Sequence, residues 1–124
     1  MSVCIKIYHP LDARNWLNIS DKNKCSCNCN SWKNHWIMNK DIDLNSGWPK
    51  ECSAAGCNNT AEFGAVIVKE SDLSNEKFIV PFCEKCYNEN KKIFTLELYT
   101  IICPADESKT CGKLKELMQP KILR

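Results

Sequence analysis

The sequence has little arginine, histidine and glycine. Only Arg14 and Arg124 among its 17 basic residues are arginines, so the guanidinium groups that read guanine edges and clamp phosphates are scarce. The four glycines are scattered, which excludes a glycine-rich phosphate loop. The two histidines, His9 and His35, leave few side chains that could act as a general base.

Long apolar runs are also missing. No segment approaches the roughly 18 apolar residues that a membrane span requires, and residues 1–10 do not resemble a signal peptide. We therefore expect a cytoplasmic protein with no membrane association. The 17 basic and 15 acidic residues give a net charge of +2, which argues against a strongly basic nucleic-acid binder.

Cysteine, by contrast, is abundant, with ten in 124 residues. A chain of this length forms one domain with a thin core, so the cysteines indicate a fold held together by disulfides or by metal. Thiols stay reduced in the cytosol, and a disulfide across Cys27-Asn28-Cys29 would be strained. The spacings Cys83-x-x-Cys86 and Cys52-x4-Cys57 are typical of metal ligands. We therefore favour zinc over a disulfide framework.

The hydrophobic pattern predicts a single α+β domain over residues 1–124. Residues 63–69 and 77–82 are rich in β-formers and flank a polar segment, which predicts a hairpin. The other expected elements are a strand at 3–7 with one buried face, a short helical turn within 11–19, helices at 32–40 and 83–93, and a strand at 94–103. Residues 104–124 should form a loop and a short basic helix.

The most informative segment, residues 51–93, has the layout of a treble-clef zinc finger. A cysteine pair (Cys52, Cys57) precedes the hairpin, and a second pair (Cys83, Cys86) falls in the first turn of the following helix. Helix N-termini stabilise thiolates, and a site with four cysteine ligands is structural because no position remains for water or substrate. The alternative is that these four cysteines are small core residues.

Residues 51–90 also resemble the HNH endonuclease family, most specifically through Pro81-Phe82-Cys83-Glu84-Lys85-Cys86-Tyr87-Asn88. The resemblance covers about forty residues and implies a ββα unit after a zinc knuckle. In many members a histidine on the first hairpin strand is the general base, and a helix asparagine or histidine helps hold a catalytic divalent cation. Asn88 matches that helix position.

The family's histidine position is filled by Val66, which cannot accept a proton. Glu62 and Glu70 flank the strand and could bind a metal, but exposed hairpin glutamates are usually only solvated. One asparagine without a base makes no hydrolytic centre, so we expect no catalytic residues.

A second zinc site is predicted from Cys27, Cys29, His35 and Cys111, with Cys25 as an alternative fourth ligand. The competing interpretation makes His35 a surface or core histidine and Cys111 a free thiol. A Cys29–His35 catalytic dyad is less in keeping with clustered thiols.

Cys4 and Cys103 lie in strand patterns, and we expect both to be core residues.

The favoured function is a non-catalytic zinc-binding module that binds a protein partner, in the manner of small cysteine-rich inhibitors and adaptors of phages and mobile elements. Four tryptophans could anchor such a partner, although tryptophans are as often in the core: Trp16, Trp32, Trp36 and Trp48. The alternatives are a divergent HNH-like nuclease and a nucleic-acid-binding protein. Five lysines would contact phosphates in the latter: Lys85, Lys91, Lys92, Lys113 and Lys115.

Overall fold

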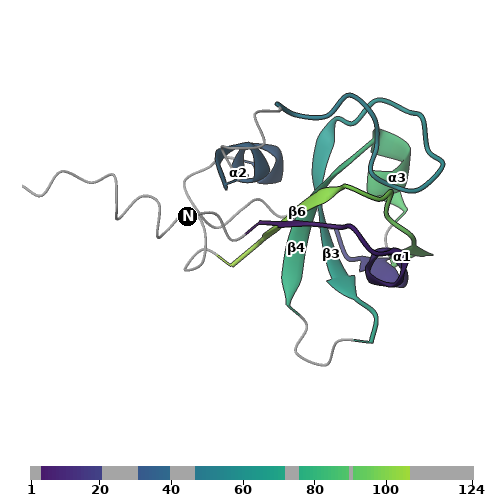
Figure 1. The fold of residues 1–124 in the computed structure, drawn as a ribbon. Helices are drawn as coiled ribbons and strands as arrows, with labels where there is room; N and C mark the ends of the chain where they lie inside the picture. Colours follow the sequence, from purple (N-terminus) through teal and green to yellow (C-terminus); the bar gives the residue numbers. More distant parts are fainter. Residues whose placement is uncertain (1–3, 21–30, 40–46, 72–75, 90, 107–124) are drawn as a thin grey trace, which may run out of the picture.

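A computed structural model of the chain describes residues 4–20, 31–39, 47–71, 76–89 and 91–106. These form an α+β fold built on a six-stranded antiparallel sheet with strand order β1-β6-β4-β3-β2-β5 (Figure 1). The strands are β1 (Ile5–Lys6), β2 (Trp16–Asn18), β3 (Phe63–Lys69), β4 (Lys77–Phe82), β5 (Ile93–Phe94) and β6 (Ile101–Pro104). The helices are α1 (Pro10–Ala13), α2 (Trp32–Asn39) and α3 (Glu84–Asn88).

The β3–β4 hairpin forms the centre of the sheet, as its β-rich sequence predicts. It is paired from Phe63 opposite Phe82 to Val68 opposite Lys77. Successive side chains point to opposite faces, so the hairpin contributes to two separate cores. Ala65 belongs to the core that also contains Cys52 and Cys83, and Val66 belongs to the one that contains Trp36.

Helix α2 covers the second of these faces. Its N-terminus is capped by Ser31, whose Oγ accepts a hydrogen bond of 3.1 Å from Asn34 N. Trp36 packs with Ile79 and Val66. The helix approaches β3 so closely that a Cβ on Gly64 would lie 2.5 Å from the backbone carbon of Trp32. Figure 1 shows α2 on one side of the hairpin and α1 and α3 on the other.

Several predicted elements have different bounds. Helix α3 ends at Asn88, well before the predicted residue 93. The strand predicted at 94–103 divides into β5 and β6, because residues 97–99 turn and Tyr99 has a left-handed φ of 70°. Within 11–19, the helix is limited to α1 and is followed by β2. In the N-terminal strand, Ile7 is buried but Ile5 is 48% exposed, so the predicted single buried face is wrong for Ile5.

Cys103 is a core residue as expected, but it forms a disulfide with Cys4, which corrects the expectation that the thiols stay reduced. The register of β1 and β6 explains the pairing: Ile5 lies opposite Ile102, which places the preceding Cys4 opposite Cys103. Cys103 is fully buried and Cys4 is half-buried. The bond therefore fixes the N-terminal edge strand to the sheet.

None of the helices in the described ranges has the length and apolar character needed to cross a membrane. The predicted C-terminal helix, together with Lys113 and Lys115, lies outside the described residues.

Candidate metal site

The first cysteine pair lies in a tight turn that is fastened to the rest of the fold. Cys57 N donates to Ala54 O at 3.0 Å, and Gly56 supplies the left-handed conformation that the turn requires, with φ of 78°. Ala55 N donates to Thr95 O at 2.8 Å, and Ala54 forms a β-bridge with Leu96. The segment after α3 therefore positions the turn.

The second cysteine pair lies at the start of α3. Cys83 is the N-cap residue, and its Sγ accepts a hydrogen bond from Cys86 N at 3.4 Å. Asn59 Nδ2 donates to the same sulfur at 3.7 Å. These donors stabilise a thiolate at Cys83, as expected for a cysteine at a helix N-terminus.

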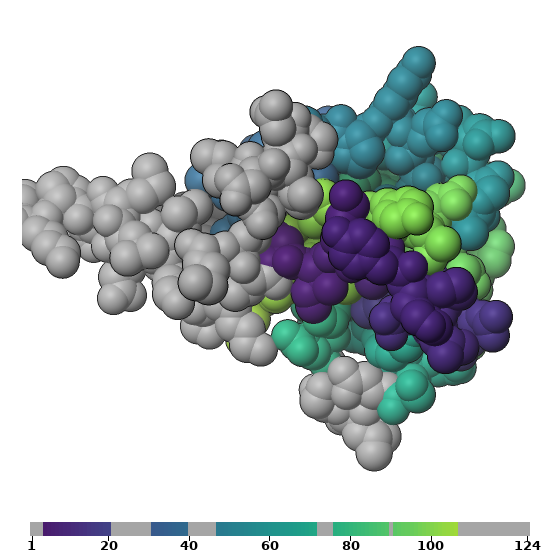
Figure 2. All heavy atoms as spheres, viewed as in Figure 1, coloured from purple at the N-terminus to yellow at the C-terminus, as the bar shows by residue number. Residues whose placement is uncertain are grey.

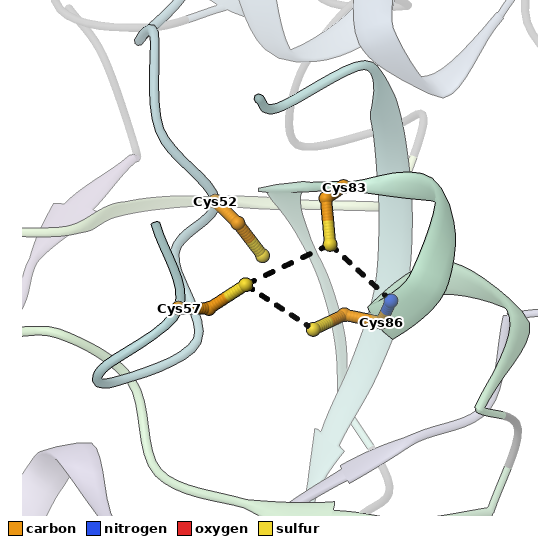
Figure 3. Close-up of side chains that lie close together, drawn as sticks. All are labelled: Cys52, Cys57, Cys83 and Cys86. Carbon is orange, nitrogen blue, oxygen red and sulfur yellow. Dashed lines mark hydrogen bonds between the residues drawn. The ribbon is translucent and has the colours of Figure 1, made fainter. Parts of the chain in front are cut away.

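The four cysteine sulfurs converge (Figure 3). All four Sγ atoms lie within 4.8 Å of one another; Cys57 Sγ is 3.8 Å from Cys83 Sγ and 3.9 Å from Cys86 Sγ. Metal–sulfur bonds of about 2.3 Å in a tetrahedron require sulfur–sulfur distances of about 3.8 Å. Cys52, Cys57, Cys83 and Cys86 could therefore hold a metal ion.

The cluster is buried on one side only. Cys52 and Cys83 are 3% and 2% exposed, whereas Cys57 and Cys86 are half-buried and line a cavity of about 810 Å³. Two lysines predicted from the sequence, Lys85 and Lys92, line the same cavity.

The lysines that were predicted to contact phosphates differ in their surroundings: one is paired with an acidic residue, and another is exposed. Lys92 Nζ forms an ion pair with Glu89 at 3.2 Å, and Glu89 also lines the cavity. Lys91 is exposed and has a left-handed φ of 67°. The cavity therefore combines cations, a carboxylate and the edge of the cysteine cluster.

In the metal-free cluster, the pKa values of the thiols are shifted in different directions. Burial raises the pKa of Cys52 to about 11, and burial likewise raises the pKa of Cys86. Burial also acts to raise the pKa of Cys83, but hydrogen bonds from the backbone and side chain of Cys86 and from Asn59 outweigh it and lower this pKa to about 7. Repulsion between neighbouring thiolates contributes to the shifts at Cys52 and Cys86, and a bound cation would remove it.

Asn18 supports the site, and it is not among the residues predicted from the sequence. It is 1% exposed, and its Nδ2 donates to three carbonyls at the end of α3: Cys86 O at 2.9 Å, Tyr87 O at 3.3 Å and Glu89 O at 2.9 Å. Its Oδ1 accepts from Ser20 N at 2.9 Å. The sequence pattern does not predict this contact, because the amide donor lies in β2 and the carbonyl acceptors lie at the end of α3, far away in the sequence.

The second predicted metal site is described only at His35. This side chain is fully buried, and its Nε2 lies 2.8 Å from Pro104 O, with its ring packed edge-on against Trp32. The predicted ligands Cys27, Cys29 and Cys111, and the alternative Cys25, lie outside the described residues.

The positions implied by the endonuclease resemblance include one buried residue and three exposed ones. Val66 is 7% exposed and faces α2, on the opposite face of the sheet from Cys52 and Cys83. Asn88, Glu62 and Glu70 are exposed.

Comparisons with known proteins give no relative for this chain: no family model, no curated protein and no solved structure matches it.

Proposed function

We propose that the chain is a non-catalytic zinc-binding module that binds a protein partner. The observation that carries the metal assignment is the convergence of four cysteine sulfurs within 4.8 Å. Four thiolates in a tetrahedron are a typical ligand set for structural zinc, and they leave no coordination position for water. The turn supplies Cys52 and Cys57, the N-terminus of α3 supplies Cys83 and Cys86, and the hairpin lies between the two pairs. This order is that of a treble clef and supports that classification.

The proposal excludes catalysis because the groups needed for hydrolysis are absent from the strand that would carry them. Val66 is packed among Trp36 and Ile79, and its backbone is engaged by Ile19 N and by Ser20 Oγ, each at 2.9 Å. Replacing this side chain by a base would bury an ionisable group against apolar neighbours. We therefore propose that the chain is an HNH-like fold without the nuclease chemistry.

A protein partner is favoured over nucleic acid by the distribution of charge and of exposed apolar groups. Four thiolates around a divalent cation carry net negative charge beside Lys85 and Lys92, and Glu89 already pairs with Lys92. Phosphates would be attracted only weakly to such a surface. Among the exposed apolar side chains, the rings of Tyr8 and Tyr99 are in contact, and Leu98 precedes Tyr99 in the same turn. Trp16 and Trp36 are buried, so these two cannot anchor a partner.

Native mass spectrometry tests the zinc assignment. We expect bound zinc in the intact protein, and the denatured mass should be two hydrogen atoms lower for the Cys4–Cys103 disulfide. The matched variants are Cys57→Ser, which removes one ligand, and Asn58→Ser, which changes the adjacent exposed residue. Loss of one zinc only in the first variant is expected. A protein that binds no zinc, or a Cys57→Ser variant that keeps the full zinc content, would contradict the assignment.

Nucleic-acid binding is the second candidate, because Lys85 and Lys92 line one cavity. Gel-shift assays at low and high salt, with Lys85→Glu as the variant and Lys50→Glu as the control, separate it from the favoured function. A shift that weakens steeply with salt and is lost only in Lys85→Glu would replace the protein-partner proposal.

A plasmid-nicking assay with Mg²⁺ or Mn²⁺, repeated on Asn88→Ala, tests for nuclease activity, and we expect no cleavage.

A further inference from the structure

A second cavity is lined by Cys52 and Ser53 at the start of the turn that carries the first cysteine pair, whereas residues 54–59 line the cavity that contains Lys85 and Lys92. It has a volume of about 540 Å³ and lies between residues 47–53 and the turn and strand at 97–101. Its apolar walls include Trp36, Leu98, Tyr99 and Ile101. We term it the Tyr99 groove. Figure 2 shows the segments that border it on one face, with the blue-teal chain near residue 50 above the yellow-green chain near residue 100.

Tyr99 is held in a conformation that is unfavourable for a large side chain. Its φ is 70°, in the region where glycine and asparagine are preferred, and its side chain is 61% exposed. Tyr99 N donates to Ile7 O, and Thr100 Oγ1 donates to Glu97 O at 2.7 Å, so the surrounding backbone enforces the turn. Local strain of this kind is concentrated at functional sites.

The aromatic surface extends from Tyr99 onto the N-terminal segment. The rings of Tyr8 and Tyr99 pack edge to face with centroids 5.9 Å apart, and Tyr8 is 65% exposed. Leu98 is 38% exposed beside them. Exposed tyrosines bordering a concave apolar surface are typical of the residues that dominate protein–protein binding energies.

The charged side chains of the groove are mainly acidic. Glu51 and Glu97 line it with a single lysine, Lys50, and all three are exposed. Glu97 Oε2 accepts a hydrogen bond from Gly56 N at 3.1 Å, which holds this carboxylate at the side of the cysteine turn. A ligand with a positive charge next to its apolar group would therefore be complementary to the groove.

We propose that the Tyr99 groove docks a segment of a partner protein that presents a large apolar side chain next to a lysine or arginine. The apolar side chain enters between Leu98 and Tyr99, and the cation lies near Glu51 and Glu97. This inference rests on the proposed function and specifies the chemistry of its partner.

The test uses a phage-displayed library of random peptides, selected on the zinc-loaded full chain. Enriched peptides should carry an aromatic or large aliphatic residue next to lysine or arginine. The affinity of one such peptide is then measured by fluorescence anisotropy. Tyr99→Gly should weaken binding by about tenfold or more, because it removes an aromatic contact. The same variant should keep or raise the thermal unfolding midpoint, because glycine relieves the left-handed strain.

Two more variants complete the design. Glu51→Lys should weaken the same peptide and reduce the sensitivity of its binding to salt. Ile93→Ala changes a side chain that is 47% exposed on β5, at the opposite edge of the sheet, and should leave the affinity unchanged.

Other outcomes would overturn the proposal. These are enrichment of acidic peptides, no enrichment, or full affinity for Tyr99→Gly. If only Ile93→Ala lost affinity for the peptide, the binding site would lie on β5. The protein-partner function would then stand, and the Tyr99 groove would be rejected as its site. Competition by a synthetic peptide of residues 107–124 would make the chain itself the occupant. Absence of zinc in the mass spectra would instead remove the proposed function, so the two failures are distinguishable.

Discussion

Asn18 connects the N-terminal part of the chain to the helix that carries Cys83 and Cys86. The last carbonyls of a helix lack the partners that a longer helix would supply, and one buried amide donates to three carbonyls at the end of α3. Loss of these hydrogen bonds would cost free energy. The side chain at position 18 therefore stabilises the metal site without contacting the cysteine sulfurs.

We predict that Asn18→Asp lowers the free energy of unfolding by about 2–4 kcal/mol, because it removes the Nδ2 donor and places a carboxylate against three carbonyls. The variant keeps the oxygen that accepts from Ser20 N. Urea unfolding of the zinc-loaded protein measures the change. Asn88→Asp, at an exposed position on α3, should stay within about 0.5 kcal/mol of the parent. Equal midpoints for the two variants would contradict the capping role.

Residue-level prediction from the sequence succeeded where spacing carries the information. The cysteine pairs are local in sequence, and metal binding needs two such pairs, so the sequence predicts that Cys52, Cys57, Cys83 and Cys86 lie together, and their sulfurs do converge. Asn18 and Tyr99 could not, because their roles depend on contacts or backbone angles that no periodicity reveals. Disulfide pairing of Cys4 and Cys103 was missed because the register of β1 and β6 is a long-range property.

At the scale of elements, the packing of α2 on β3 depends on the missing side chain of Gly64. A methyl group there would lie 2.5 Å from Trp32 C and 2.6 Å from Lys33 N, both backbone atoms. These atoms cannot move without displacement of the helix.

We predict that Gly64→Ala destabilises the fold by about 1–3 kcal/mol through overpacking. Thermal or chemical unfolding measures it, and Gly47→Ala is the matched control, since no atom lies within 4 Å of the place that a methyl group would take there. An unchanged stability of Gly64→Ala would show that α2 can move away from the sheet without loss.

The hairpin and α2 could be predicted because each has a strong local pattern and, for α2, a capping serine. The strand expected at 94–103 was wrong in its middle. Leu96 and Leu98 alternate as in a strand, but Leu96 bridges to Ala54 and is buried, whereas Leu98 is at the groove and 38% exposed. A turn that uses a tyrosine in place of glycine gives no recognisable sequence signal.

At the scale of the whole molecule, bound metal should change how stability responds to pH above the ordinary thiol pKa of 9.0. In the metal-free protein, the raised pKa values of Cys52 and Cys86 favour the folded state below the ordinary thiol value of 9.0. This contribution is lost as the pH rises from 9.0 through about 11. The lowered pKa of Cys83 contributes above 9.0, and that contribution is lost as the pH falls through about 7.

We therefore predict that the unfolding midpoint of metal-free protein falls as the pH rises above 9.0. The zinc-loaded protein should not show this fall, because its thiolates are already ionised and bound. Its stability should instead decrease below pH 9.0, since unfolding then takes up protons on released thiols. Circular dichroism melts of zinc-loaded and chelator-treated samples test both slopes. A zinc-loaded protein that becomes less stable in parallel with the metal-free one above pH 9.0 would contradict the metal assignment.

The disulfide between Cys4 and Cys103 has a sequence separation of 99 residues and so closes most of the chain into a covalent ring. A single protease cut anywhere within that ring, for example between β3 and β4, would open the ring but release no fragment. The two fragments of the nicked protein would stay covalently joined and run as one species in a denaturing gel. Addition of a reductant would then separate them. The N-terminal strand and the segment that carries Tyr99 would thus remain tethered through damage that would divide an ordinary linear domain.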